Sequence, residues 1–267
     1  MVHFVGAGSG APDLITVRGK HLIGEADVII YAGSLVNPEL LDDRRPGVPV
    51  YNSAVMTLEE TVAVMREAEQ QGKTTVRLHT GDPCIYGAIR EQMDALDALD
   101  IDYDVTPGVS SFLAAAAALR MEYTLPGISQ SVVVTRMEGR TPVPKRESIQ
   151  AFAAHHASMA IFLSVGRITE LEERLIEGGY AVDTPAAVAY KVSWPGERTF
   201  VCTVGTLAQT VQKHHITKTA LILVGDAIAH RAYERSKLYD PGFTTEYRKE
   251  SGEDEKNNRG GYRAGGV

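Results

Sequence analysis

Cysteine is scarce in this chain of 267 residues: it has only Cys84 and Cys202, and they form no CxxC or Cys/His ligand pattern. A structural zinc site is therefore not expected. The count alone allows one disulfide, but a reducing cytoplasm is the favoured setting for so little cysteine.

Long apolar stretches and targeting signals are also missing. No apolar run reaches the roughly 18 residues that a membrane span needs. The start, MVHFVGAG, lacks the basic and apolar regions of a signal peptide and instead predicts a strand that runs into a glycine loop. We expect a soluble, cytoplasmic protein without a membrane partner.

Basic residues are in deficit. The chain has 27 Lys and Arg against 34 Asp and Glu, which gives a formal net charge of −7. This balance argues against general nucleic-acid binding but leaves room for a local basic patch. Histidines at 155–156 and 214–215 stand in adjacent pairs that cannot share a helix face, so we expect them at the surface and expect no metal site. No Ser/His/Asp relay and no paired carboxylates are evident, which is typical of a reaction driven by positioning.

What the sequence does contain is a regular alternation of strands and helices, with 44% apolar residues for a core. A helix is expected at residues 57–71, opening on a capping box of Thr57 and Glu60, and another at residues 86–99. The β-loop-α order predicts a mostly parallel sheet that binds ligands at the carboxyl ends of its strands. In the second half, expected strands at 185–192 and 198–203 are joined by a short turn, which predicts a mixed sheet.

This pattern predicts an α/β protein of two domains. We expect an N-terminal domain at residues 1–118, a C-terminal domain at 119–240, and a tail at 241–267. The tail is rich in Gly, Arg, Glu and Asn and has no apolar periodicity, so it is predicted to be disordered.

Three loops that follow strands are candidate ligand sites. GAGSG at residues 6–10 fails as a dinucleotide fingerprint because Pro12 and Asp13 follow and the helix begins later; a tight turn without a ligand explains it equally well. GDP at 81–83 offers a carboxylate to a ligand hydroxyl such as a ribose, or Asp82 caps the next helix. PGVSS at 107–111 offers hydroxyls and amides at a helix start, or another cap. For these last two, capping is the stronger interpretation of either loop alone.

Two further segments carry polar chemistry. The basic stretch RMEGRTPVPKR at 136–146 could bind substrate carboxylates through bidentate Arg contacts, although a charge run is usually a solvated loop. Tyr190 and Lys191 precede Trp194 and could pack against a flat ligand, although a Trp is more often a packing residue.

The order of these motifs is more specific than any one of them. The series VGAGSGAPDLIT, ADVIIYAGSLV, VRLHTGDPCIYG, VTPGVSSFLAAAA and TALILVG resembles the tetrapyrrole (precorrin) methylase family over about residues 2–230. Within that family, YAGSLV, EGRTPVP and YKVSWPGE resemble the members that methylate C-11 of precorrin-4 or cobalt-precorrin-4. The resemblance implies a homodimer, and S-adenosyl-L-methionine bound in the cleft between two α/β domains.

The resemblance also implies site residues. The first glycine loop is expected to face the tetrapyrrole more than the cofactor. Cofactor contacts are expected from Ser9, Thr80, Gly81, Asp82, Ile85, Ser110, Ser111, Leu163, Tyr190, Lys191, Val192, Thr219 and Ala220. Substrate contacts are expected from Gly8, Arg18, Lys20, Arg136, Arg140, Lys145 and Arg146. No catalytic residue is assigned.

The expected activity is therefore S-adenosylmethionine-dependent methylation of C-11 in corrin (cobalamin) biosynthesis, by direct in-line displacement. Three alternatives stay open: a methyltransferase of the same fold acting on uroporphyrinogen III or another precorrin, an RNA or protein methyltransferase, and a non-catalytic nucleotide-binding module. The sequence does not decide whether the tetrapyrrole carries cobalt, although the cobalt form is favoured.

Overall fold

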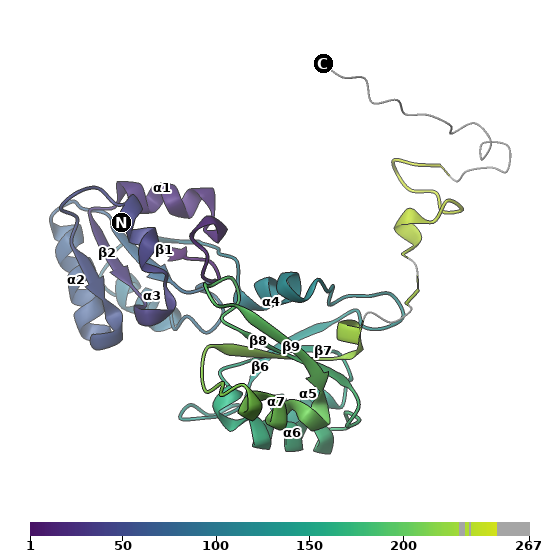
Figure 1. Ribbon diagram of the computed structural model, residues 1–267. Helices are drawn as coiled ribbons and strands as arrows, with labels where there is room; N and C mark the ends of the chain where they lie inside the picture. The colour runs from purple at the N-terminus through teal and green to yellow at the C-terminus, as the bar shows by residue number, and fades with distance from the viewer. Residues whose placement is uncertain (230–232, 235, 250–267) are drawn as a thin grey trace.

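A computed structural model describes residues 1–229, 233–234 and 236–249 of the chain. Two five-stranded sheets, one from each half of the sequence, build two lobes (Figure 1). The predicted disordered tail at 241–267 lies outside the described residues from position 250 onward.

The first sheet is parallel throughout, in the order β3-β2-β4-β1-β5, as the β-loop-α rhythm predicts. Its central strand, β4, is buried at every position because helices cover both faces of the sheet. The strands are β1 (Val2–Gly6), β2 (Val28–Tyr31), β3 (Val50–Asn52), β4 (Thr75–His79) and β5 (Tyr103–Thr106).

Three helices sandwich this sheet. On one face, Ile23 of α1 (Val17–Glu25) packs with the apolar side chains of the strands. On the other, Met65 of α2 (Leu58–Gln70) and Leu96 of α3 (Arg90–Asp97) pack around Phe4. Thr57 and Glu60 bond reciprocally at the start of α2, so the predicted capping box is confirmed.

The second sheet is mixed, in the order β6-β7-β10-β8-β9, which confirms the prediction of a mixed sheet in the second half of the chain. β6 runs parallel to β7, whereas β10 is antiparallel to both β7 and β8, and β9 to β8. The strands are β6 (Val132–Arg136), β7 (Ser158–Phe162), β8 (Pro185–Tyr190), β9 (Arg198–Thr203) and β10 (Ala220–Val224).

Helices also cover both faces of the second sheet. One face carries α5 (Ile149–Ala153), α6 (Ile168–Glu177) and α7 (Leu207–Lys213) in one apolar cluster. The opposite face carries α4 (Ser111–Leu119), whose alanines pack against β8 and β10. The division after residue 118 stays a prediction, but this packing favours a boundary before α4.

The chain departs from prediction at one strand end, at one helix start and in three short elements. The strand predicted at 185–192 ends at Tyr190, because Lys191 has a left-handed backbone. The predicted helix at 86–99 is wrong over its first four residues, since α3 begins at Arg90. Tyr86 and Ala88 instead have left-handed backbones, with φ of 57° and 50°. β3, α5 and α7 were not predicted, because elements of three to seven residues hold too few residues to show a period.

Candidate active site between the two sheets

The loops at the carboxyl ends of β1, β4 and β5 are joined backbone to backbone. Gly8 and Gly81 exchange two hydrogen bonds, of 3.2 Å from the Gly8 amide and 2.8 Å from the Gly81 amide. A Cβ on Gly108 would lie 2.2 Å from the Gly81 carbonyl oxygen and 2.8 Å from the Gly6 Cα. Glycine at these positions therefore allows the three loops to touch.

Asp82 fastens two of these loops. Its Oδ2 accepts a hydrogen bond from the Gly108 amide at 2.9 Å, and its Oδ1 accepts one from the Cys84 amide at 2.8 Å. The next helix begins only at Arg90 and has no side-chain cap. The capping interpretation of Asp82 is therefore wrong, and its carboxylate organises the loop edge instead.

The other predicted residues of this edge lie beside Asp82. Ile85 donates its amide to the Asp82 carbonyl at 3.2 Å. Ser110 is buried and precedes α4, but its side chain makes no capping bond, and Ser111 is the first residue of that helix. The cap alternative for Ser110 is therefore not what the structure shows.

His79 and Thr80 bring unpartnered polar atoms to the same edge. His79 Nε2 and Thr80 Oγ1 are both buried without a hydrogen-bond partner in the described part of the chain. Burial, together with the positive Arg77 nearby, lowers the pKa of His79 to about 3, so its ring is neutral at physiological pH. Thr80 Oγ1 is thus a group that a bound ligand could satisfy.

The facing edge of the second sheet has unusual backbone geometry. Leu163 after β7, Lys191 after β8 and Thr219 before β10 have left-handed backbones, with φ of 53°, 49° and 56°. They share one edge because β10 is antiparallel to β7 and β8, and the Lys191 amide donates to the Thr219 carbonyl at 2.9 Å. Each such residue costs roughly 1–2 kcal/mol, and strain of this kind clusters at functional sites.

Leu163 is the apolar residue of this group. Its side chain is 74% exposed although it directly follows a buried strand. Of the neighbouring predicted residues, Tyr190 and Ala220 form one register pair, and Val192 is buried against the α4 side of the sheet.

Ser9 faces the second lobe rather than open space. Its hydroxyl lies 2.8 Å from the hydroxyl of Ser193, and its carbonyl accepts from Trp194 Nε1 at 3.0 Å. The hairpin between β8 and β9 therefore closes onto the first glycine loop.

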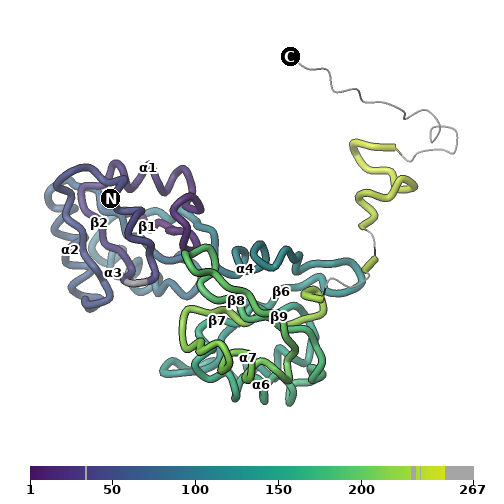
Figure 2. The backbone as a smooth tube through the Cα atoms, viewed as in Figure 1, coloured from purple at the N-terminus to yellow at the C-terminus, as the bar shows by residue number. Residues whose placement is uncertain are grey.

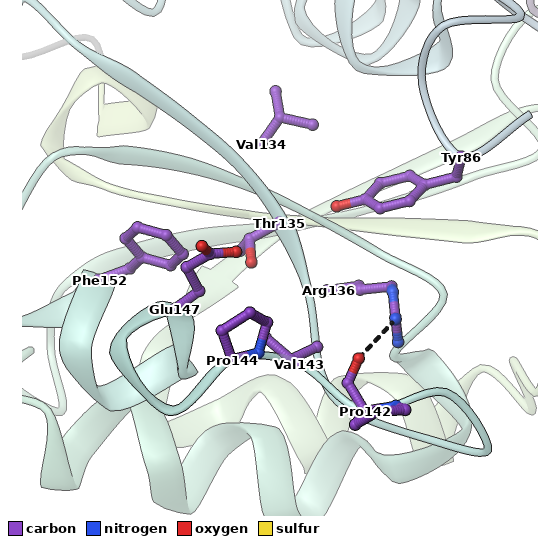
Figure 3. A pocket seen from close by; sticks show the side chains of 9 residues that line it. All are labelled: Tyr86, Val134, Thr135, Arg136, Pro142, Val143, Pro144, Glu147 and Phe152. Carbon is purple, nitrogen blue, oxygen red and sulfur yellow. Dashed lines mark hydrogen bonds between the residues drawn. The ribbon is translucent and has the colours of Figure 1, made fainter. Parts of the chain in front are cut away.

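A cavity of about 210 Å³ lies between Tyr86, in the loop after β4, and the segment that follows β6 (Figure 3). Tyr86 enters it from the loop after β4, and its ring centroid lies 5.4 Å from that of Phe162. Burial raises the pKa of the Tyr86 hydroxyl, which keeps it a neutral hydrogen-bonding group. Tyr86 was not predicted as a site residue because it fell inside the predicted helix.

Arg136 lines the same cavity and shapes it. Its guanidinium donates to the carbonyls of Met137, Thr141 and Pro142 at 3.1–3.2 Å, which folds the EGRTPVP segment around the side chain. Among the predicted substrate cations, Arg136 is the one that lines this cavity.

The remaining predicted cations are spread over the surface. Arg18 and Lys20 are exposed on α1, where Lys20 pairs with Asp43 at 3.2 Å. Arg140, Lys145 and Arg146 are exposed around the segment after β6, and Arg146 lies 3.5 Å from Glu147. The structure thus does not gather these side chains at one point.

The part of the chain that the structure describes shows neither a metal-binding cluster nor a membrane-spanning helix. No three His, Cys, Asp or Glu side chains cluster there in a way that could hold a metal ion. None of the helices there is long and apolar enough to span a bilayer.

A parallel sheet whose glycine loops meet the strained strand ends of a mixed sheet defines a two-lobed α/β protein with a candidate ligand site between its sheets. The family model for tetrapyrrole (corrin/porphyrin) methylases matches residues 1–208. The chain belongs to that family.

Individual relatives agree with this assignment. A protein of Methanocaldococcus jannaschii named cobalt-precorrin-4 C(11)-methyltransferase is 53% identical over 248 residues, 93% of this chain and 96% of its own length. The X-ray structure of cobalt precorrin-4 methyltransferase, a cobalamin biosynthetic enzyme, matches with a TM-score of 0.83 at 44% identity, over 85% of this chain and 95% of that one. Uroporphyrin-III C-methyltransferase of Thermus thermophilus, crystallised with S-adenosyl homocysteine, matches with a TM-score of 0.72 at 26% identity, over 87% and 95%.

Proposed function

We propose that this protein methylates C-11 of cobalt-precorrin-4, with S-adenosylmethionine as the methyl donor, in corrin (cobalamin) biosynthesis. The observation that carries the proposal is 53% identity, over nearly the full length of both chains, to a relative that is named for this reaction. The cobalt belongs to the substrate, and metal-free precorrin-4 is the alternative form.

The residues at the facing edges of the two sheets fit the cofactor. S-adenosylmethionine carries hydroxyls, an amino-acid group and an adenine, which need hydrogen-bonding partners in a site that excludes water. Thr80 offers a buried oxygen that has no hydrogen-bond partner among the described residues. Ser110, just before α4, offers a hydroxyl that makes no capping bond, and Ser111, the first residue of α4, offers another hydroxyl. The residues that would hold the cofactor are Ser9, Thr80, Gly81, Asp82, Ile85, Ser110, Ser111, Leu163, Tyr190, Lys191, Val192, Thr219 and Ala220.

The protein contributes to the reaction by positioning the methyl donor and the tetrapyrrole. When bound, S-adenosylmethionine supplies a sulfonium-activated methyl group, so no strong base is needed to start the transfer. The joined loops of the first sheet and the strained edge of the second hold the reactants in line and keep water out. Alignment of this kind is worth roughly 7–11 kcal/mol of the barrier.

The cavity beside Tyr86 is proposed to receive part of the substrate periphery. Arg136 uses three of its donor contacts on backbone carbonyls, which fixes the direction of its plane. The other guanidinium N–H groups can bind a peripheral carboxylate of the tetrapyrrole. We further propose that the enzyme is a homodimer in the cytoplasm; light scattering on the purified chain would test the dimer.

The deciding experiment incubates the purified protein with methyl-labelled donor and either cobalt-precorrin-4 or precorrin-4, followed by NMR location of the label. We expect the label at C-11, with a higher kcat/KM for the cobalt form. A label at another carbon would favour a related tetrapyrrole methylase, and transfer to RNA or protein would favour those substrates. Tight cofactor binding without transfer to any acceptor would indicate a binding module.

A further inference from the structure

The hairpin between β8 and β9 makes a direct clasp between the two lobes. Trp194 Nε1 donates to the Ser9 carbonyl at 3.0 Å, and the Ser193 hydroxyl lies 2.8 Å from that of Ser9. The Ala11 amide also donates to Ser193 Oγ at 3.2 Å. Figure 2 shows the green hairpin reaching the purple segment that precedes α1.

The contact is also tight in shape. Gly10 has a φ of 152°, and a Cβ built on it would lie 2.2 Å from both Cδ1 and Nε1 of Trp194. The indole therefore lies directly on the backbone of the glycine loop, in the space that any other residue at position 10 would fill.

The hairpin is in turn braced on the second lobe. The Trp194 amide donates to the Lys191 carbonyl at 3.0 Å, and the Ser193 amide donates to Glu197 Oε2 at 2.6 Å. Lys191 is itself bonded to Thr219 on the strained edge. A short chain of contacts thus leads from the proposed cofactor edge through Trp194 to the loop at residues 6–11.

Many polar groups of the loop at residues 6–11 are already hydrogen-bonded to other parts of the protein. Besides the clasp, Ala7 bonds to His79, Gly8 bonds to Gly81, and the Gly10 carbonyl accepts from Asn37 Nδ2 at 2.9 Å. A loop of small residues held in this way is suited to form a firm wall for a flat macrocycle, whereas cofactor recognition needs free polar groups of the kind found at Thr80.

We infer that Trp194 is a positioning residue for methyl transfer: it sets the separation between the loop at residues 6–11 and the cofactor edge of the second sheet. The inference rests on the proposed function. It assigns to YKVSWPGE a role in aligning the two reactants, because Ser193 and Trp194 both belong to that segment.

The test is a comparison of Trp194→Phe with Tyr180→Phe. Both substitutions remove one ring-borne donor to a backbone carbonyl, but Tyr180 bonds to Ala157 inside the core of the second lobe, away from the clasp. For Trp194→Phe we expect kcat to fall about 5- to 50-fold, since an error of about 1 Å can cost 100-fold. The Kd of S-adenosyl homocysteine and the KM of the tetrapyrrole should change less than twofold. Tyr180→Phe should lower thermal stability and leave kcat unchanged.

Ser193→Ala provides a second probe that keeps the indole and removes the contacts to Ser9 and Ala11. It should lower kcat in the same way. An unchanged kcat in folded Trp194→Phe and Ser193→Ala proteins, or a loss of cofactor affinity in place of kcat, would overturn the inference while leaving the proposed function intact. An inactive wild-type enzyme would overturn the proposed function, and the inference with it.

Discussion

Arg77 on β4 donates from Nε to Oε1 of Gln92 on α3 at 3.0 Å, and both side chains are buried. Gln92 makes a second hydrogen bond, in which its Nε2 donates to the carbonyl of Ala88 at 2.9 Å. This relay of two hydrogen bonds connects the core of the first lobe to residues 86–88, the segment from which Tyr86 enters the cavity. Burial lowers the pKa of Arg77 to about 10, so the guanidinium stays charged at neutral pH and needs its partners.

Gln92→Ala should therefore destabilise the protein by about 2–3 kcal/mol, because it leaves a buried charged donor without its acceptor. Urea denaturation followed by circular dichroism measures the change. Gln70→Ala, at an exposed position of α2, is the matched control and should stay within about 0.5 kcal/mol of wild type. Equal effects of the two substitutions would show that the relay contributes nothing.

Asp82→Ala should weaken binding of S-adenosyl homocysteine by about 10- to 100-fold in calorimetry, equivalent to about 1.4–2.8 kcal/mol. The substitution frees the Gly108 and Cys84 amides and loosens the loops proposed to hold the cofactor. Asp82→Asn should lose less, since its amide oxygen can still accept one of the two bonds.

Asp42→Ala, at an exposed position outside the site, controls for the loss of a carboxylate. Unchanged affinity in the Asp82→Ala protein would rule Asp82 out of the cofactor site.

Gly108→Ala should cost about 1–3 kcal/mol of stability by overpacking, because the added methyl group meets backbone atoms that cannot rotate away. The Gly81 carbonyl oxygen would be 2.2 Å from the new Cβ. Gly139→Ala is the control, as a Cβ there has nothing within 4 Å. Thermal unfolding of both variants gives the comparison; a Gly108→Ala protein as stable as the control would mean that the three loops can move apart freely.

His79 should make stability depend on pH. Its folded-state pKa, about 3, lies below the ordinary value of 6.5, so between these values the unfolded chain binds a proton that the native chain does not. The contribution of His79 to the free energy of unfolding is complete above pH 6.5. It is lost as the pH falls towards 3, by at most about 1.4 kcal/mol per pH unit.

His79→Gln should flatten this slope. Urea unfolding of wild type and variant between pH 4 and 7 would measure it, and parallel curves for the two proteins would contradict the assignment of a neutral, buried His79.

Local sequence signals determine much of the framework. Runs of apolar residues bounded by glycine loops predict the parallel strands, because both faces of such a sheet must be covered. Thr57 and Glu60 fix the start of α2 through bonds made within four residues of chain. The predicted site at the strand ends follows from the same logic, and the loops after β1, β4 and β5 do meet there.

Only the tertiary structure decides the features that depend on distant partners. Ala88 has a high helix propensity, yet both it and Tyr86 have left-handed backbones within a segment joined to Arg77 through Gln92. The contact of Ser9 with the cofactor stays a prediction, whereas the contact of its hydroxyl with Ser193, 184 positions further along the chain, has no signal in the sequence. The sequence by itself thus determined most of the strands, the capping box of Thr57 and Glu60 and the glycine turns, whose causes are local. Folding decided which loop faces which, because that depends on contacts between residues that no sequence period relates.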